Sequence, residues 1–309
     1  MSRDRPAPLD PALPGERFDV DLDGFGRLQA YGAGPAGQGA SAEPVLLVHS
    51  VNAAASAFEV RALYTRLADS RPVYGFDLPG FGLSERPGRL YTPRLMTDAV
   101  HAVVDAVRAR HGGVPVHALG LSLSSEYVAR AAVERPDDYR TLALVSPTGF
   151  DSRGRREGPE GANRGMGWLR SALTCGLWDD GLFGLLTKPG VVRYFLRRTW
   201  GSKEIDEDVW AYAVATARQP GAKHAPLSFL SGHLFSADIS RVYDALRMPV
   251  WMSHGVRGDF VDYRGVDAVE DRDNWSITVF DTGALPHVEV PDPFVQAYAT
   301  FLGGGRPSV

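Results

Sequence analysis

Short apolar runs alternate along most of the chain with segments in which apolar residues recur every three or four positions. A short continuous apolar run is typical of a buried strand, and the longer period is typical of an amphipathic helix. The runs occupy residues 45–48, 73–76, 114–119 and 142–145, and the helical patterns occupy 56–67, 95–107 and 123–133. Such β–α alternation predicts a parallel sheet that helices cover on both faces.

The alternation changes at the start of the chain and again after residue 149. Residues 1–14 contain four prolines and few apolar side chains, so we expect a loose tail. Residues 18–22 and 28–31 flank the glycines at 24 and 26 and predict a hairpin. From 149 to about 240 the pattern is helical, and strand-like runs return at 250–253 and 277–280 before a last helix.

These patterns predict an α/β fold with a mostly parallel, eight-stranded sheet and helices on both faces. We expect the core to comprise residues 15–148 and 239–303, with a flexible tail at 1–14. Residues 149–238 should form an inserted helical lid, since a long insertion that interrupts the alternation of a compact domain is usually functional. Its aromatic side chains, among them Trp168, Trp178 and Tyr194, should either form the lid's own core or line an apolar pocket.

Composition and charge narrow the classes of partner. Hydrophobic residues make up 44% of the chain and charged residues 23%, which suits a globular protein with a sizeable core. A formal net charge of −4 gives no attraction to nucleic acid or to an anionic membrane, so we expect neither as a partner. The chain's start lacks a signal-type apolar segment, and no 18 apolar residues run together, so we expect a cytoplasmic protein.

No sequence pattern requires a cofactor or a metal ion. The single cysteine, Cys175, cannot form an internal disulfide, and histidines and cysteines nowhere show zinc-ligand spacing. Gly32-Ala-Gly34-Pro-Ala-Gly37 matches the G-x-G-x-x-G pattern of dinucleotide sites, which needs a helix directly after the glycines. A strand follows here instead, so a flexible turn is favoured and we expect no cofactor and no metal.

The strongest chemical motif is Gly120-Leu-Ser122-Leu-Ser124, which stands between a predicted strand and a predicted helix. A nucleophile elbow needs that context, since its sharp turn strains the central residue and requires small residues two positions away. The turn would present the Ser122 hydroxyl at the carboxyl edge of the sheet. It would also aim the N–H of Leu123 at a developing oxyanion. The simpler alternative is a serine-rich helix cap.

Together with two further motifs, the elbow resembles the α/β-hydrolase fold superfamily, in its capped serine-hydrolase branch. Asp77-Leu-Pro-Gly-Phe-Gly-Leu-Ser84 is similar to a D-x-P-G-x-G-x-S segment of that family, and His49-Ser50-Val51 to its H-G-x segment. The resemblance covers about residues 16–302. It implies that Ser122 is the nucleophile and that the oxyanion is held by amides of Leu123 and of Ser50 or Val51.

The resemblance also implies that an acid and then a histidine follow the lid. His254-Gly-Val-Arg-Gly258-Asp259 is similar to the family's H-G-x-x-D with one extra residue, so Asp259 is the expected acid and Asp262 the second choice. In Gly283-Ala284-Leu-Pro-His287, relatives carry the histidine directly after the glycine, where this chain has Ala284. His287 is therefore the expected general base, but from a position three residues later.

Three hypotheses remain about the base. His287 reaches Ser122 through a shift of its loop, or a lid histidine such as His224 or His233 replaces it, or the site no longer performs acyl transfer. We expect a serine-dependent hydrolase of a small, apolar carboxylic ester or thioester that works through an acyl-enzyme. The alternative is a catalytically divergent relative that binds a ligand or performs lyase or isomerase chemistry, as Ala284 suggests.

Overall fold

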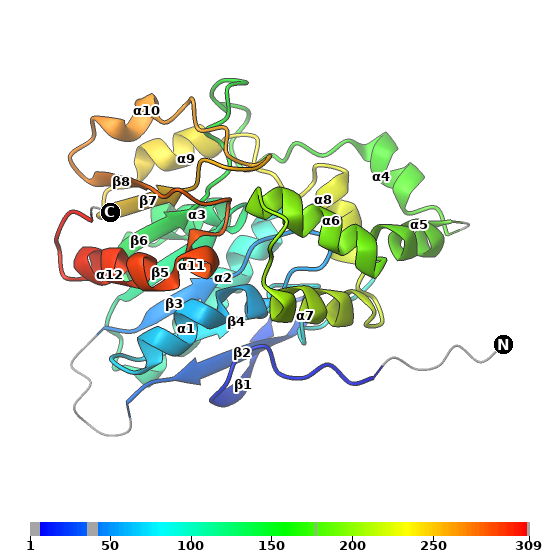
Figure 1. Cartoon of the computed structure of the whole chain (residues 1–309), viewed down its shortest axis with the longest axis horizontal. Helices are drawn as coiled ribbons and strands as arrows, with labels where there is room; N and C mark the ends of the chain where they lie inside the picture. Colours follow the sequence, from blue (N-terminus) through cyan, green and yellow to red (C-terminus); the bar gives the residue numbers. More distant parts are fainter. Residues whose placement is uncertain (1–6, 36–42, 177, 308–309) are drawn as a thin grey trace.

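The computed structural model describes residues 7–35, 43–176 and 178–307. Eight strands form one sheet in the order β1-β2-β4-β3-β5-β6-β7-β8 (Figure 1). Their bounds are β1 Glu16–Leu22, β2 Gly26–Ala33, β3 Val45–Val48, β4 Val73–Phe76, β5 Val116–Leu121, β6 Tyr139–Val145, β7 Val250–His254 and β8 Trp275–Val279. From β4 to β8 along this order every neighbouring pair is parallel, whereas β2 is antiparallel to both of its neighbours, β1 and β4. This confirms the predicted mostly parallel sheet.

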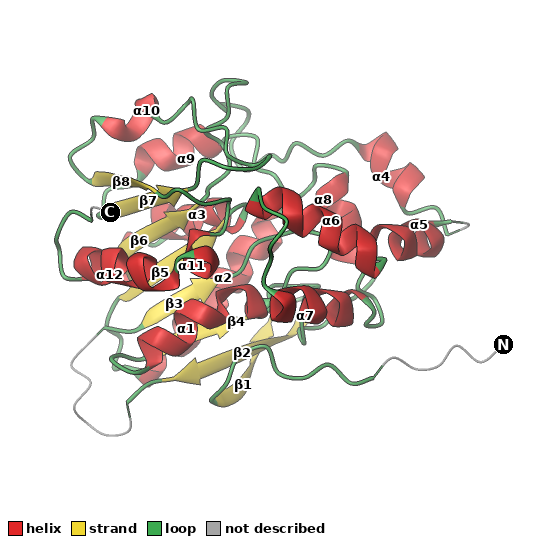
Figure 2. Cartoon of the chain, in the orientation of Figure 1, coloured by secondary structure: helices red, strands yellow, loops and turns green. Residues whose placement is uncertain are grey.

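Helices cover both faces of the sheet (Figure 2). Their bounds are α1 Arg61–Ala68, α2 Pro93–Arg110, α3 Ser124–Glu134, α4 Gly167–Leu173, α5 Asp179–Leu186, α6 Pro189–Trp200, α7 Glu207–Ala217, α8 His224–Leu230, α9 Ile239–Ala245, α10 Asp267–Glu270, α11 Pro286–Glu289 and α12 Pro291–Leu302. Two short 3₁₀ helices, η1 Ala57–Val60 and η2 Pro136–Asp138, complete the described elements. The alternation read from the sequence thus becomes a three-layer α/β core.

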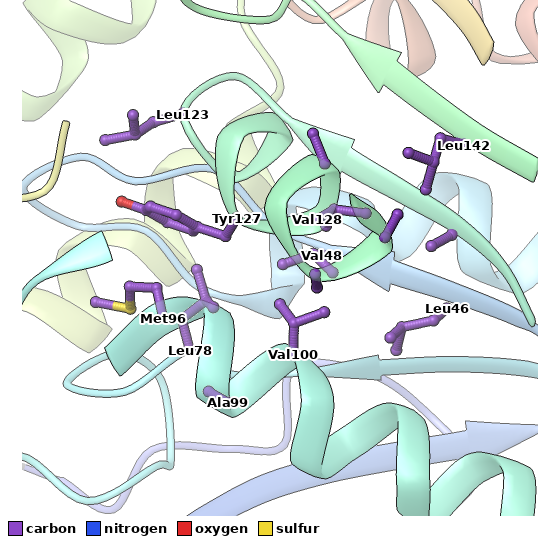
Figure 3. Packing of buried hydrophobic residues seen from close by; sticks show 14 of the residues in the cluster. Leu46, Val48, Leu78, Met96, Ala99, Val100, Leu123, Tyr127, Val128 and Leu142 are labelled. Carbon is purple, nitrogen blue, oxygen red and sulfur yellow. The ribbon is translucent and has the colours of Figure 1, made fainter. Parts of the chain in front are cut away.

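Successive residues of the central strands point to opposite faces, so the sheet separates two hydrophobic clusters. Leu46 and Val48 pack with Val100 of α2 and Val128 of α3, in the layer that Figure 3 shows from close by. Val45 and Leu47 belong to the other cluster, which includes side chains of α1 and α12. Burial of both faces explains why these strands read as unbroken apolar runs.

The chain between β6 and β7 contains α4 to α9 and adds no strand to the main sheet among the residues described there. A single isolated bridge pairs Asn163 with Ser236, near the two ends of this stretch. We keep the name lid segment for residues 149–238, and its division from the core stays a prediction.

The expected loose tail is wrong for the residues just before β1. Residues 1–6 lie outside the described part, but Ala12 and Leu13 are almost fully buried. A Cβ at Gly75 would lie 2.6 Å from Leu13 Cδ1, so Leu13 fills the space that a glycine leaves on β4. The Tyr64 hydroxyl also donates to the carbonyl oxygen of Pro14 at 3.0 Å. Ala12 and Leu13 therefore belong to the core, and the exposed Pro14 is held to α1 by this hydrogen bond.

Two other expectations concern ligands and membranes. Gly32 lies within β2 and pairs with Tyr74, and β3 is the next described element after it, whereas Gly37 of the G-x-G-x-x-G motif lies outside the described residues. None of the helices in the described ranges has both the length and the apolar character needed to cross a bilayer.

Candidate active site

Ser122 occupies a strained turn between β5 and α3. Its φ of 52° lies in the left-handed region that non-glycine residues seldom adopt. Its N–H donates to the carbonyl oxygen of Val145 at the end of β6, over 2.8 Å, and its own carbonyl accepts from the N–H of Ser125. Such strain persists only where the surrounding structure enforces it and is common at functional sites.

Small residues on both sides of Ser122 permit this turn. A Cβ at Gly120 would come within 3.0 Å of the carbonyl oxygen of Ser124 and the Cα of Ser125. Ser124, where relatives usually have glycine, is fully buried, and its hydroxyl donates to the carbonyl oxygen of His49. This hydrogen bond ties the first turn of α3 to the loop after β3.

The candidate oxyanion-hole amides differ in whether their N–H groups already donate a hydrogen bond within the protein. Among the described residues, the N–H groups of Leu123 and Val51 have no hydrogen-bond acceptor. The N–H of Ser50, in contrast, donates to Glu59 Oε2 at 2.9 Å, and Asn52 donates to the other carboxylate oxygen at 2.8 Å. Of the two expected amides after β3, only that of Val51 is free, within the described part of the chain, to donate to a ligand.

His287 lies on the short helix α11 and is almost fully buried. Its Nε2 donates to the main-chain carbonyl oxygen of Glu59 over 2.9 Å. Its Nδ1 is buried and, among the described residues, has no hydrogen-bond partner. The ring packs edge-on against Phe294 of the final helix, with ring centroids 5.8 Å apart. Burial lowers the pKa of His287 to about 4, so the imidazole is neutral at pH 7.

Ala284, the position that the sequence resemblance assigns to the family's histidine, lies in a tightly held loop. Its N–H donates to the carbonyl oxygen of Thr199 at 2.9 Å. At the preceding residue, a Cβ on Gly283 would come within 2.5 Å of carbonyl oxygens at the end of α6. Glu289 accepts from the N–H of Gly283 at 2.6 Å and pairs with Arg257 at 2.7 Å. The loop is therefore fixed between α6 and α11.

The two candidate acids are engaged in ion pairs near the surface. Asp259 pairs with Arg198 of α6, and both side chains are more than a third exposed. Asp262 pairs with Arg264 and accepts from the hydroxyl and the N–H of Ser152, and these contacts, Arg264 foremost, lower the pKa of the Asp262 carboxyl. Across the described part of the chain, neither carboxylate makes a hydrogen bond to His287.

Other histidines are similarly occupied. His49 contacts the carbonyl oxygen of Ser50 through Nδ1, and its Nε2 accepts from the N–H of Leu78 at 3.0 Å. His233 of the lid segment bonds to Ser231 at 2.9 Å, and no hydrogen bond joins it or His224 to Ser122 within the ranges described. In these same ranges, no group of three or more histidine, cysteine, aspartate or glutamate side chains could hold a metal ion.

Sequence reasoning overlooked two residues beside the elbow. Glu59 contacts the loop after β3 through its carboxylate and His287 through its carbonyl oxygen. Ser146, at the end of β6, has a φ of 48° and a buried hydroxyl. A lone glutamate in the apolar segment 53–60 was a usable signal, whereas nothing local indicates the strain at Ser146.

The structure thus brings Ser122, Leu123 and Val51 to one edge of the sheet and leaves His287 and Asp259 in separate contacts. A strained serine between a strand and a helix, with free amides beside it, on this sheet topology, defines the α/β-hydrolase class. The family model for the alpha/beta hydrolase family matches residues 45–297, so the chain belongs to that family. The expected recognition is confirmed, and the class of protein is that of hydrolase enzymes.

Solved structures share the fold of this chain. A probable hydrolytic enzyme from Pseudomonas aeruginosa superposes with a TM-score of 0.70 at 20% identity, covering 94% of this chain and 95% of that one. A thermophilic esterase from Thermogutta terrifontis gives a TM-score of 0.68 at 18% identity, over 94% of this chain and all of the other. At these identities the likeness shows the fold.

A match among characterised sequences covers less of the chain. An abhydrolase domain-containing protein of Caenorhabditis elegans is 30% identical over 112 residues. The match spans 35% of this chain and about a quarter of the relative's own length, 24%.

Proposed function

We propose that the elbow binds a small, apolar carboxylic ester or thioester and that Ser122 is its acyl acceptor. The observation that carries this proposal is the strained Ser122 with the unengaged amide of Leu123 directly after it. Ser122 Oγ would attack the acyl carbon while the amides of Leu123 and Val51 stabilise the oxyanion. The alcohol or thiol then leaves with a proton, and water cleaves the acyl-enzyme to release the acid.

The proposed reaction is slow, because no base is hydrogen-bonded to Ser122 among the described residues. A positioned general base contributes about 10²- to 10⁴-fold to such a step. For His287 to supply it, the ring must leave the carbonyl oxygen of Glu59, and for Asp259 to orient the ring, its pair with Arg198 must open. That His287 is the base and that Asp259 is the acid therefore stay hypotheses, and both require these two contacts to open.

The carboxylate of Glu59 gives a second reason to expect slow acylation of Ser122. It accepts the N–H of Ser50, which is one residue before the free amide of Val51. A negative charge beside an oxyanion hole opposes the charge that develops on the carbonyl oxygen. The same carboxylate does not oppose binding of a neutral ester.

Hydrolysis of p-nitrophenyl butyrate tests the proposal. We expect a low rate in the intact protein that Ser122→Ala removes, whereas Ser171→Ala on the exposed side of α4 leaves it unchanged. A rate that survives Ser122→Ala would contradict the assignment of the acyl acceptor.

A second function is favoured by Ala284 and by the bond between His287 and Glu59. In that alternative the site binds an acyl compound, or performs lyase or isomerase chemistry on it, without an acyl-enzyme. It predicts that calorimetry detects binding of a non-hydrolysable ester analogue and that no covalent adduct forms on Ser122.

A further inference from the structure

Helix α4 buries none of its residues although its sequence is mostly apolar. It spans Gly167–Leu173, and the indole of Trp168 is 72% exposed. A surface helix normally packs an apolar stripe against the core, so an apolar helix without buried residues lacks its partner. The sequence predicted a lid core or a pocket lining for Trp168, and a place in the lid core is wrong for this residue, because 72% of its side chain is exposed.

The exposed apolar surface extends from α4 to α5 and α6. We use the name lid rim for six exposed large side chains there: Met166, Trp168, Trp178, Leu185, Tyr194 and Phe195. Trp178 is held against α4 by a hydrogen bond from its Nε1 to the carbonyl oxygen of Ala172, at 2.9 Å. Figure 1 shows α4 and α5 at the end of the molecule away from the sheet, with α6 between them and the sheet.

The charge around the lid rim is opposite to that of the whole chain. Residues 164–200 contain six basic and two acidic side chains, whereas the complete chain has a net charge of −4. Both acidic groups, Asp179 and Asp180, are paired with Lys223. Arg193 and Arg198 are paired as well, with Glu207 and Asp259. Of the six basic residues in 164–200, four form no ion pair with any described residue: Arg164, Arg170, Lys188 and Arg197.

We propose that the lid rim is a docking surface for an anionic lipid bilayer. Short helices that expose aromatic rings together with unpaired basic side chains suit the headgroup region of a bilayer. There the rings bury their apolar surface at the boundary with the acyl chains, and the cations pair with lipid phosphates. A second copy of the chain would bring the same positive charge against itself. The expectation of no membrane partner rested on total charge, which averages this basic segment with an acidic remainder.

Vesicle sedimentation tests the docking surface with the full chain. We expect binding to vesicles of phosphatidylcholine with 30% phosphatidylglycerol at least tenfold above that to phosphatidylcholine alone, and a decrease with rising salt. The emission of the exposed tryptophans should shift to shorter wavelength on binding. The doubly substituted Trp168→Phe/Trp178→Phe protein should lose most of that shift and keep binding.

Substitutions distinguish docking through the lid rim from non-specific adsorption to vesicles. Trp168→Glu with Trp178→Glu should reduce vesicle binding at least tenfold, while Val279→Glu, at a half-exposed position on the edge strand β8, should not. Absence of binding by the folded protein at low salt would overturn the proposal, as would equal loss in Val279→Glu. So would a dimer, detected by ultracentrifugation, that buries these tryptophans. The test does not depend on Ser122, so Ser122→Ala should bind vesicles unchanged.

Discussion

His287 donates through Nε2 to the main-chain carbonyl oxygen of Glu59, over 2.9 Å, although the two residues are 228 positions apart in the chain. This hydrogen bond fixes the neutral tautomer with the proton on Nε2 and holds the ring between η1 and the final helix. It connects α11 to the segment whose carboxylate engages the amide of Ser50. The imidazole thus braces the loop after β3 in this structure.

His287→Ala should therefore act on stability more than on the reactivity of Ser122. Loss of a buried ring and its hydrogen bond should lower the free energy of unfolding by about 2–4 kcal/mol. His287→Gln, which retains a donor, should lose less. Urea unfolding measures the first effect. Abolished ester hydrolysis in a variant that stays folded would instead identify His287 as the base.

Ala284→His places an imidazole at the position where relatives carry it. Because the residues beside Ser122 are already suited to acyl transfer, we expect the rate of p-nitrophenyl butyrate hydrolysis to rise about tenfold or more. The rate should stay below that expected of a complete catalytic triad, since Asp259 is paired with Arg198 and does not orient the new imidazole. Ala284→Gln controls for the added volume and should give no rise. An unchanged rate in Ala284→His would mean that this loop does not face Ser122.

Glu59→Gln removes the negative charge beside the candidate oxyanion hole and keeps an acceptor for the N–H of Ser50. The acylation of Ser122 should become faster by about three- to tenfold, because the variant no longer repels the developing oxyanion. Stopped-flow measurement of p-nitrophenol release from p-nitrophenyl butyrate gives the rate of acylation. Slower acylation would show that the carboxylate assists the reaction, as a base acting through water would.

The buried imidazole of His287 should make the free energy of unfolding depend on pH. The pKa of His287 is lowered from 6.5 to about 4 by burial, so between these values the unfolded chain binds a proton that the folded protein does not. Stability should fall as pH decreases from 6.5 to 4, by at most about 3 kcal/mol from this residue. His117, whose pKa is also lowered to about 4, adds to the slope. In His287→Gln the slope should be shallower, and an identical slope would contradict the burial argument.

The fold could be predicted because its signals are local. Val45 to Val48 read as a strand since both of their faces are covered, and the small residues at 120 and 124 indicated the turn at Ser122. The ordered start of the chain could not be predicted, because Leu13 is buried only where Gly75 of a later strand leaves room.

The contacts of the site depend on pairs that are distant in the chain. The orientation of His287 follows from a carbonyl group in η1, and the engagement of Asp259 follows from Arg198 at the end of α6. Periodicity marked Trp168 as part of a helix but could not show that nothing in the described structure covers it.

Labelling with a fluorophosphonate, followed by mass spectrometry of the peptide that contains residue 122, tests the central claim most directly. We predict a single adduct on Ser122 that forms slowly, forms faster in Ala284→His, and is absent in Ser122→Ala. An adduct on another residue, or no adduct after prolonged exposure of the folded protein, would contradict the assignment of Ser122 as the acyl acceptor.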